Sequence, residues 1–531
     1  MSTATVTIDG RRIEVTAEQT ILDVARKAGL DIPTLCYLEK CGPLNTCQVC
    51  LVKLNGKLVP SCGTIAEPGM TIESETEEVY EARRTALELL FSDHVGDCLA
   101  PCQRLCPLGL NIPGLLRQVQ SQDTPGAIQT VRATLPLAGV LGVLCHHPCE
   151  QGCRRGHWDG PATIRDIERH VAELEDDQMF AGIQKECEPG RPSLAIIGAG
   201  PSGLAAAFYL ARAGTAVTVF DRNKEPGGTL RMEQLPAGIL AREISILQRL
   251  GVKIETGIEL GSGVSLTDLL AKFGAVLVAI GDPVGQTALG LPLSSGRIQV
   301  DPHTHLTPLK NVFATGAAVR STRQLVRVMA EAKAAADCLR DHLKGIAPKA
   351  LQRPFSSVMG RLSPLELKHF ISVNNAAAAT TPCNRCASTG KSDPAGHGHP
   401  TPALQTLFTP LQATTEASRC LHCDCASSGN CILQHYAQLY NADANRFRSE
   451  RRPFECQVMP GGIIFEPGKC ILCGICVKIT ELAAEPLGLT FIGRGFDVKL
   501  AAPLNQTIED GLRKCAKECV DNCPTGALSM R

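Results

Sequence analysis

The chain has 531 residues, with 53 basic and 53 acidic side chains and a formal net charge of zero. This neutral balance and an aromatic content of 4% exclude a nucleic-acid-binding protein that relies on a basic surface and stacking side chains. The 26 cysteines are the unusual feature. In a long chain that begins with no secretory signal pattern, clustered cysteines are typical of metal ligands in the cytoplasm rather than of disulfides. The most apolar stretch, residues 195–211, is too short and too interrupted to predict a membrane span.

The pattern along the chain predicts a multidomain α/β plus α+β protein. Residues 1–80 alternate short apolar runs with turns, and residues 81–190 have helical periodicity. Residues 191–345 follow the order strand, glycine turn and helix, which predicts an α/β domain. Residues 346–403 are loose in composition and are interpreted as a linker. Residues 404–531 are rich in cysteine, glycine and proline and form a last domain.

The first domain contains a cysteine pattern, C-x10-C-x2-C-x11-C, that can wrap four thiolates around a [2Fe-2S] cluster. A zinc site is the alternative, but zinc usually takes two CxxC-like pairs and this segment has one. The predicted ligands are Cys36, Cys47, Cys50 and Cys62. With "EPGMTIES", the segment resembles the ferredoxin domain that opens the iron-sulfur subunit of respiratory NADH:quinone oxidoreductase and the diaphorase subunit of NAD-reducing hydrogenase. The resemblance implies a β-grasp ferredoxin fold.

Two further groups of cysteines, each spaced C-x3-C-x3-C, follow in the helical region. Residues four apart share one helical face, so each group can converge on iron. The segments "CPLGLNIPGLL" and "CHHPCEQGC" resemble the N-terminal domain of the glutamate synthase small subunit and of dihydropyrimidine dehydrogenase. The resemblance implies two [4Fe-4S] clusters, one held by Cys106, Cys145 and Cys149 and the other by Cys98, Cys102 and Cys153.

One early cysteine of that family is missing here. His94 stands four residues before Cys98, and the same H-x3-C step marks a histidine-ligated [4Fe-4S] cluster in the respiratory subunit. His94 is therefore a candidate ligand, although a lone histidine is more often an ordinary surface or core residue. The sequence is compatible with His94 as a cluster ligand and with His94 as an ordinary residue.

The segment "SLAIIGAGPSGLAAAFYLARAGTAVTVFD" has the order strand, glycine turn, helix, second strand and acidic residue. Glycines at these positions let the backbone approach a pyrophosphate at a helix N-terminus, and the acid binds ribose hydroxyls. With "EPGGTL" and "NVFATGAAVRSTRQL", the segment resembles the FAD domain of the glutamate synthase family. The predicted FAD contacts are Gly198, Gly200, Pro201, Ser202, Gly203, Asp221, Gly227, Gly228 and Gly316.

Two departures from that family concern the flavin domain. Ala317 stands where the family usually has an aspartate near the flavin ribityl-phosphate region. Only about 30 residues separate "GAVLVAIGD" from "NVFATG", and a βαβ unit alone needs about 30. No second glycine fingerprint occurs between them, so we expect a truncated Rossmann-type domain that lacks the NAD(P)H-binding insert.

The last domain contains two cysteine-rich segments. The first, "EASRCLHCDCASSGNCILQ", resembles the histidine-ligated segment of the respiratory subunit, with Glu416 in place of the histidine; it implies the ligands Cys420, Cys423, Cys425 and Cys431. The second, "FEPGKCILCGICVKIT" with "CAKECVDNCPTGAL", resembles a bacterial ferredoxin and implies one [4Fe-4S] cluster on Cys470, Cys473, Cys476 and Cys523. Thr480 occupies the position of a ligand to a second cluster. Four cysteines stay unassigned: Cys383, Cys386, Cys515 and Cys519.

Together these motifs predict FAD, one [2Fe-2S] cluster and three to four [4Fe-4S] clusters, with no separate catalytic residue. The first hypothesis is a cytoplasmic, FAD-dependent iron-sulfur oxidoreductase that serves as the electron-transfer subunit of a larger complex. Its partner would be a hydrogenase, a formate dehydrogenase or an NADH dehydrogenase-like unit, with ferredoxin as a further partner. The alternative is a self-contained NAD(P)H-dependent reductase similar to the glutamate synthase small subunit. A zinc-rich interaction protein is the third interpretation.

Overall fold

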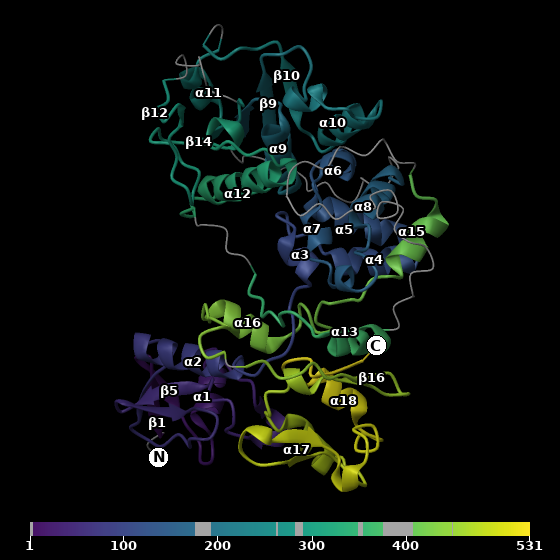
Figure 1. Ribbon diagram of the computed structural model, residues 1–531. Helices are drawn as coiled ribbons and strands as arrows, with labels where there is room; N and C mark the ends of the chain where they lie inside the picture. The colour runs from purple at the N-terminus through teal and green to yellow at the C-terminus, as the bar shows by residue number, and fades with distance from the viewer. Residues whose placement is uncertain are drawn as a thin grey trace. The chain divides into compact units, whose positions relative to one another are not determined.

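The computed structural model describes residues 4–175, 193–261, 264–281, 290–348, 354–374, 407–448 and 450–530. The chain divides into two compact units (Figure 1). Unit 1 comprises Met1–Ala100, Pro354–Asn375 and Leu421–Arg531, and unit 2 comprises Pro101–Arg353 and Ala376–Cys420. In sequence, unit 2 is therefore inserted into unit 1.

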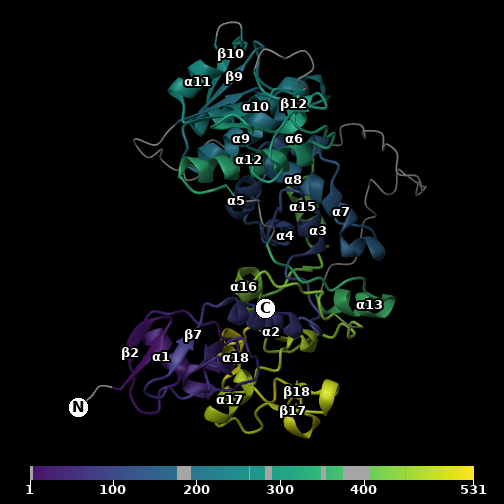
Figure 2. The ribbon, with the colours of Figure 1, turned by 90° about the vertical axis from the view of Figure 1, so that its left-hand side faces the viewer.

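Unit 1 begins with a mixed five-stranded sheet, which Figure 2 shows beside helix α1 (Ile21–Lys27). The strand order is β2 (Arg11–Glu14), β1 (Thr5–Ile8), β7 (Thr71–Glu73), β5 (Leu51–Leu54) and β6 (Lys57–Pro60). A capping box between Thr20 and Asp23 starts α1, and the apolar face of the helix packs on the sheet core. The segment between α1 and β5 contains β3 (Tyr37–Leu38), η1 (Glu39–Cys41) and β4 (Gly42–Pro43).

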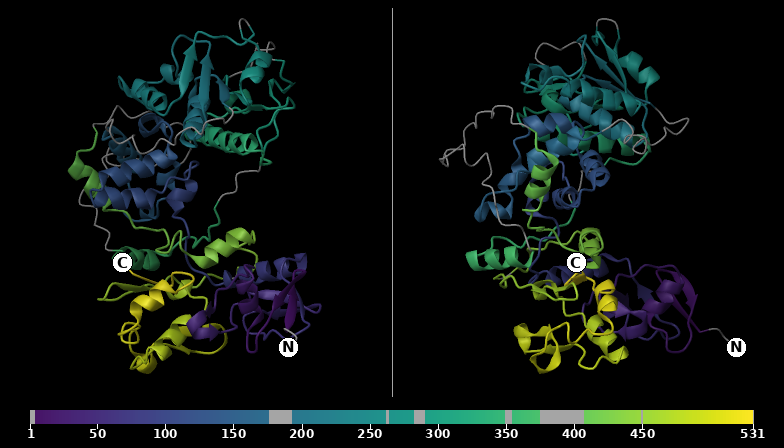
Figure 3. Two further views of the ribbon diagram at one scale, coloured as in Figure 1. Left: turned by 180° about the vertical axis from the view of Figure 1, so that it is seen from behind. Right: turned by 90° about the vertical axis from the view of Figure 1, so that its right-hand side faces the viewer.

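The remainder of unit 1 surrounds the C-terminal cysteines. An antiparallel sheet has the order β15 (Gln457–Val458), β16 (Ile463–Phe465) and β19 (Leu528–Met530), and a hairpin joins β17 (Thr490–Ile492) to β18 (Lys499–Ala501). The helices are α2 (Glu77–Leu90), α13 (Pro364–Val373), α16 (Ile432–Leu439), α17 (Ile475–Leu482) and α18 (Ala516–Asp521). One apolar cluster contains both Cys47 and Cys473, so the N-terminal and C-terminal segments of the chain share a core (Figure 3).

Part of the stretch predicted as a linker is ordered structure. Residues 354–374 belong to unit 1 and include α13, which starts at a capping box between Ser363 and Glu366. Cys383 and Cys386 lie outside the described residues. The other predicted domain boundaries stay predictions.

Unit 2 contains a parallel sheet in the order β10 (Lys253–Thr256), β9 (Val217–Asp221), β8 (Leu194–Ile197), β11 (Ala275–Val278) and β14 (Val312–Ala314). Every residue of β8 and β11 is buried, as expected for central strands covered on both faces. Helices α9 (Pro201–Arg212) and α12 (Leu325–Leu343) pack closely on one another (Figure 1). The remaining elements are α10 (Ile239–Arg249), α11 (Leu266–Lys272), and the hairpin of β12 (Leu293–Ser294) and β13 (Arg297–Ile298).

The helical part of unit 2 is built from short helices, two of which begin at side-chain caps, from Asn111 and Asp123. They are α3 (Pro101–Leu105), α4 (Ile112–Gln120), α5 (Thr124–Thr134), α6 (Ala138–Leu144), α7 (Pro148–Gln151) and α8 (Ile164–Glu173). Helix α15 (Pro410–Ala417) packs on α4 and α8 although it is distant in sequence. Among the described residues, no single helix is long and apolar enough to cross a membrane; α5 with α6, bent by 81°, meets the length and composition criteria only as a pair.

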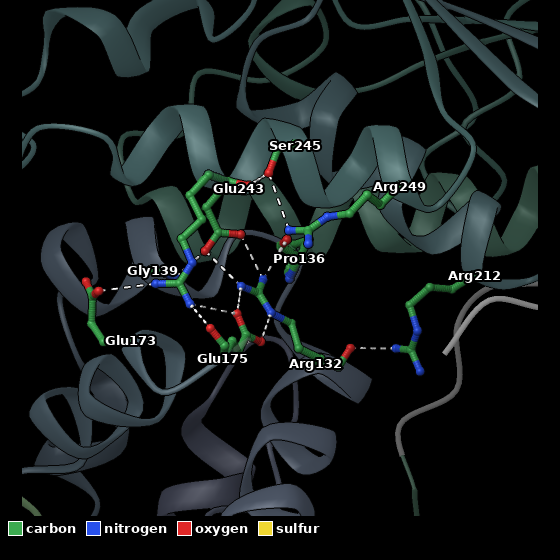
Figure 4. Close-up of polar contacts among 10 residues, drawn as sticks. Arg132, Pro136, Gly139, Glu173, Glu175, Arg212, Glu243, Ser245 and Arg249 are labelled. Atoms are coloured by element: carbon green, nitrogen blue, oxygen red, sulfur yellow. Dashed lines mark hydrogen bonds and ion pairs between the residues drawn. The ribbon is translucent and has the colours of Figure 1, made fainter. Parts of the chain in front are cut away.

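A buried ion-pair network joins these helices to the flavin-type sheet domain (Figure 4). The Arg132 guanidinium on α5 donates to the Glu243 carboxylate on α10 at 2.8 and 3.0 Å, and to the Glu175 carboxylate at 2.5 and 2.6 Å. These three side chains are at most 2% exposed. Glu243 also accepts a hydrogen bond from the backbone N–H of Gly139 at 2.6 Å. The two layers of unit 2 are therefore held by paired charges as well as by apolar packing.

Candidate iron-sulfur and flavin sites

The four N-terminal cysteines predicted to hold a [2Fe-2S] cluster come together in unit 1. All four are at most 5% exposed. They form two pairs: Cys50 Sγ lies 3.3 Å from Cys62 Sγ, and Cys36 is hydrogen-bonded to Cys47. Two pairs of thiolates are the arrangement that a two-iron cluster requires, with one pair on each iron.

A hydrogen bond between the two thiols of each pair shifts their pKa values in opposite directions. A hydrogen bond from the Cys47 side chain lowers the pKa of Cys36 to about 5, and one from Cys62 lowers the pKa of Cys50 to about 6. The pKa values of the two donors are raised correspondingly. In each pair the hydrogen bond favours the thiolate form of the accepting cysteine, which is the form that binds iron.

A second site in unit 1 is formed by the predicted ferredoxin-like cysteines. Cys470, Cys473, Cys476 and Cys523 all line one cavity of about 400 Å³. The other lining residues are almost all apolar, including Phe465, Ile475 and Leu528. Burial raises the pKa of Cys470 to about 11, so this ligand is a neutral thiol until a metal replaces its proton.

Cys515 and Cys519, which the sequence left unassigned, lie beside this cavity. Cys519 lines it, and its Sγ is 4.0 Å from that of Cys515. Glu485 accepts hydrogen bonds from the backbone N–H and the thiol of Cys515, at 3.0 and 3.4 Å. Thr480 uses its hydroxyl to satisfy the backbone at Val477 and Leu489. Thr480, which stands where a second cluster would need a cysteine, is therefore engaged in backbone hydrogen bonds.

The two unit 1 sites are connected through the protein. Thr46, next to Cys47, donates from its hydroxyl to the backbone carbonyl of Cys473 at 3.2 Å. Leu44 lies against Gly474, where an added Cβ would be 3.4 Å from Leu44 Cδ1. The loop of the [2Fe-2S] site therefore contacts the loop of the C-terminal [4Fe-4S] site directly.

A third group in unit 1 differs from the predicted groupings. Burial raises the pKa of Cys98, and the neighbouring charge of Cys425 raises it further. Burial raises the pKa of the Cys431 thiol to about 12, and the nearby Cys425 and Cys98 raise this pKa further. The backbone N–H of Cys425 donates to the Cys98 carbonyl at 3.4 Å. Cys98 thus lies with Cys425 and Cys431, whereas the sequence grouped it with Cys102 and Cys153.

His94 lies near Lys469, whose ammonium group interacts with Cys425 of this third group. Its Nδ1 is buried without a hydrogen-bond partner among the described residues. Burial, with a contribution from Lys469, lowers the pKa of His94 to about 3, so the ring is neutral and can offer a nitrogen to iron. An added Cβ on Gly96 would lie 3.2 Å from His94 Nε2 and 3.1 Å from Lys469 Cε, which shows how closely these groups pack.

Unit 2 contains a cavity of about 280 Å³ lined by Cys106, Cys145 and Cys149, the three cysteines that the resemblance grouped together. It also reaches Val326 in the first turn of α12. This helix follows Gly316, a predicted flavin contact. The cysteine-lined cavity therefore adjoins the flavin-type domain inside a single compact unit.

Sequence reasoning missed a fourth polar group in this cavity, Glu168. The side chain is buried, and desolvation together with the charge of Glu150 raises its pKa to about 8. Its charge in turn raises the pKa values of Cys106, Cys145 and Cys149. A carboxylate facing three thiols is a suitable fourth ligand to a cluster. The sequence did contain one indication of this role, because Glu168 lies among the apolar residues on the buried face of α8.

The thiols of these groups are spread over cavity walls. Among the described residues, no group of three or more His, Cys, Asp or Glu side chains is arranged around a single metal ion. An iron-sulfur cluster needs its thiolates farther apart than a single metal ion does, because each iron of the cluster takes its own protein ligands.

The predicted flavin turn has the geometry that dinucleotide binding requires. An added Cβ on Gly198 would lie 2.4 Å from the Ala279 carbonyl oxygen, and one on Gly203 would lie 1.8 Å from the Gly198 oxygen, so both positions are closed to side chains. At Gly200 an added Cβ would meet nothing within 4 Å. Gly200 is also the N-cap of α9 and provides no side-chain cap, which leaves the helix N–H groups available to phosphate. The chain thus fits FAD at this turn.

The other predicted flavin contacts surround the same turn. Asp221 accepts from the backbone N–H of Ala199 at 2.6 Å and of Asn223 at 2.8 Å, which fixes the acid at the end of β9. An added Cβ on Gly228 would lie 2.9 Å from Gly200 Cα, and one on Gly316 would lie 2.1 Å from Ser202 Oγ. Pro201 and Gly227 flank these residues in the sequence. At Ala317, the backbone carbonyl accepts from the Arg297 guanidinium.

Comparison with protein families agrees with these sites. Residues 2–77 match the 2Fe-2S iron-sulfur cluster binding domain, residues 73–180 match dihydropyrimidine dehydrogenase domain II with its 4Fe-4S cluster, and residues 162–336 match the pyridine nucleotide-disulphide oxidoreductase family. The chain is therefore a multidomain iron-sulfur flavoprotein of the oxidoreductase class, with FAD, [2Fe-2S] and [4Fe-4S] cofactors.

The relatives are subunits of redox enzymes. The chain is 35% identical over 213 residues to the NADP(+)-dependent formate dehydrogenase subunit beta of Moorella thermoacetica, covering 34% of this chain and 29% of that protein. It is 34% identical over 200 residues to the NAD-dependent dihydropyrimidine dehydrogenase subunit PreT of Salmonella typhimurium, covering 36% and 48%. It is 32% identical over 188 residues to the NADPH-Fe(3+) oxidoreductase subunit beta of Geobacter sulfurreducens, covering 34% and 28%. The chain spans less than half the length of each of these relatives.

Among solved structures, the NAD+-reducing [NiFe]-hydrogenase in its H2-reduced state is 37% identical, with a TM-score of 0.17, over 17% of this chain and 39% of that chain.

Proposed function

We propose that the chain is the electron-transfer subunit of a larger oxidoreductase complex. In this role its flavin domain exchanges two electrons with a partner or substrate, and its iron-sulfur sites carry single electrons. The single observation that carries the proposal is the unit 2 cavity, in which Cys106, Cys145, Cys149 and Glu168 adjoin the flavin helix α12 at Val326. Bound FAD would supply the step between two-electron and one-electron chemistry.

The finer assignments belong to the same proposal. The N-terminal sheet is assigned as a β-grasp ferredoxin fold, the C-terminal segment as a bacterial-ferredoxin-like fold, and the unit 2 sheet as a truncated Rossmann-type fold. The partner is a formate dehydrogenase, hydrogenase or NADH dehydrogenase-like unit, and ferredoxin is a further candidate. The compartment is the cytoplasm, where reduced thiols favour cluster assembly over disulfides.

In unit 1 the proposed electron route runs between two sites in direct contact. The Thr46 hydroxyl bonds to the Cys473 carbonyl, so the [2Fe-2S] loop and the C-terminal [4Fe-4S] loop are joined by a hydrogen bond at 3.2 Å. The surrounding residues belong to one apolar cluster, which keeps water from the path between the two sites. The two unit 1 sites thus transfer electrons to one another and do not act as independent redox centres.

The alternative function is a self-contained NAD(P)H-dependent reductase. A hydride donor must be held against the flavin ring by its own binding site. Between β11 and β14 the chain has residues 279–311, and their described part contains only the β12–β13 hairpin. This short connection favours the subunit role.

The test is stopped-flow mixing of the anaerobic full-length protein with NADH, with NADPH and with reduced ferredoxin. We expect reduced ferredoxin to bleach the flavin and the nicotinamides to give only slow, non-saturating reduction. Cys145→Ala should slow the reduction by ferredoxin, because it removes a ligand beside the flavin helix. Cys338→Ala, a buried cysteine of α12 outside every proposed ligand set, is the matched control. Rapid, saturable flavin reduction by NADH or NADPH would favour the self-contained reductase instead.

A further inference from the structure

Cys102, Cys153 and Cys420 of unit 2 lie outside the cavity beside the flavin helix. All three are partly buried and pack against the same apolar core. Helix α3, which contains Cys102, packs on α7. An added Cβ on Gly152 would lie 3.2 Å from the Pro101 carbonyl oxygen and 2.4 Å from Leu105 Cδ1. The residue before Cys153 therefore touches both ends of the short helix that presents Cys102.

Two arginines fix Cys420 against the segment that follows Cys153. Arg155 Nη1 donates to the backbone carbonyl of Arg419, the residue before Cys420, at 2.5 Å. Both guanidinium groups also reach Asp159, at 2.6 Å from Arg155 and 3.5 Å from Arg419. Arg419 further donates to the Gly160 carbonyl at 2.9 Å. These two segments, which are far apart in the sequence, are thus joined by three of these hydrogen bonds, one from Arg155 and two from Arg419.

The charge at this junction suits an anionic group. Arg154, Arg155 and Arg419 are 7%, 1% and 3% exposed, although arginine is rarely so buried in proteins. Burying a guanidinium is unfavourable unless negative charge compensates for it. Asp159 pairs with Arg155 and Arg419, and Glu416 pairs with Arg419 at 2.7 Å, so these carboxylates supply part of that charge. Thiolates on iron would add to it. Arginine is always protonated, so this positive field persists at every physiological pH.

We propose that Cys102, Cys153 and Cys420, all of unit 2, bind one [4Fe-4S] cluster. Cys420, which follows the flavin domain in the sequence, thereby takes the place of the early cysteine that is missing from the first group. Cys98, which the sequence grouped with Cys102, belongs instead with His94, Cys425 and Cys431.

The proposal rests on the iron-sulfur content of the proposed function but not on its electron partner. It gives the chain one [2Fe-2S] and four [4Fe-4S] clusters, or about 18 irons per chain. Its test is iron and acid-labile sulfide analysis of full-length cysteine variants purified anaerobically. This readout does not depend on electron transfer, so the failure of this ligand set and the failure of the subunit role are separate results.

Double variants separate the groupings. Cys102→Ala and Cys420→Ala should each lose about four irons, and the double variant should lose no more than either single variant, because both residues bind the same cluster. Cys98→Ala with Cys420→Ala should lose about eight. An additive loss of about eight irons in Cys102→Ala with Cys420→Ala would overturn the proposal. So would a loss of only about four in Cys98→Ala with Cys102→Ala.

Serine variants keep the test decisive if the alanine variants misfold. Cys102→Ser and Cys420→Ser should alter the same electron paramagnetic resonance signal, because a serine oxygen can replace a thiolate on iron. Cys98→Ser should alter a different signal. Cys338→Ala is the matched control, with full iron expected. Changes in two different signals for Cys102→Ser and Cys420→Ser would also overturn the proposal.

Discussion

Replacing Arg132 with methionine should destabilise unit 2 more than any single surface substitution. Arg132 neutralises both Glu175 and Glu243, and the side chains of all three residues are at most 2% exposed. Methionine has a similar apolar length, so the change mainly removes the charge and leaves two carboxylates buried without their cation. Removing one partner of a buried ion pair typically costs about 3–5 kcal/mol. Unit 2 comprises Pro101–Arg353 and Ala376–Cys420, which is about 300 residues. For a unit of that size, the loss corresponds to a decrease of roughly 5–8 °C in the unfolding temperature.

The assay is thermal unfolding followed by the release of flavin fluorescence, since the network lies between the cluster helices and α10 of the flavin domain (Figure 4). Glu243→Gln should have a smaller effect, because Arg132 keeps Glu175. The matched control is Arg231→Met, which removes an exposed pair with Glu225 and should change stability by less than about 1 kcal/mol. If Arg132→Met unfolds within about 1 kcal/mol of the wild-type protein, the buried network does not contribute as argued.

Three further predictions concern separate sites. Gly200→Val should yield protein without flavin, because the side chain would occupy the open space beside the α9 N-terminus; full flavin occupancy by absorbance would contradict this. Cys47→Ser should abolish or shift the [2Fe-2S] electron paramagnetic resonance signal and leave the [4Fe-4S] signals intact, whereas loss of several signals would contradict separate ligand sets. Hydrogen bonds from Arg451, Phe454 and Ser363 lower the pKa of Glu366 from 4.5 to about 2. Its stabilisation is therefore complete above pH 4.5 and is lost as the pH falls toward 2, so Glu366→Gln should cost about 1–3 kcal/mol at neutral pH and flatten the acid dependence of denaturant unfolding; an unchanged acid slope would contradict it.

The local motifs were predictable because short-range geometry dictates them. The glycine turn requires one residue type at each of three positions, and the structure closes Gly198 and Gly203 by backbone contacts while leaving Gly200 open. The ferredoxin-like set on Cys470 and Cys523 follows from spacing rules that hold within one small fold. In each case the sequence window that forms the site contains most of its chemistry.

The groupings of the middle cysteines were not predictable in the same way. Cys98 and Cys102 stand four residues apart, and the C-x3-C rule assigns them to one cluster. In the structure, Cys98 belongs to unit 1 and Cys102 to unit 2, so a domain boundary falls inside the motif. Glu168 was missed for a related reason. Its role depends on the side chains that α6 and α7 bring to the same cavity, which no periodicity reveals.

The boundary inside the motif has a consequence for assembly. The Cys425 N–H donates to the Cys98 carbonyl at 3.4 Å, so the first exit of the chain from unit 1 and its last return to it lie close together. An inserted domain with adjacent ends can fold without distorting its host. However, His94 and Cys98 precede the insertion, whereas Cys425 and Cys431 follow it, so a cluster at this site closes the loop that contains unit 2. Because the entropic cost of closing a loop rises by only about 0.6 kcal/mol for each doubling of its length, even so long an insertion is a small penalty against the binding of a cluster. The ligand set can therefore tolerate a whole flavin module between Cys98 and Cys425, provided that the two ends of the module lie close together.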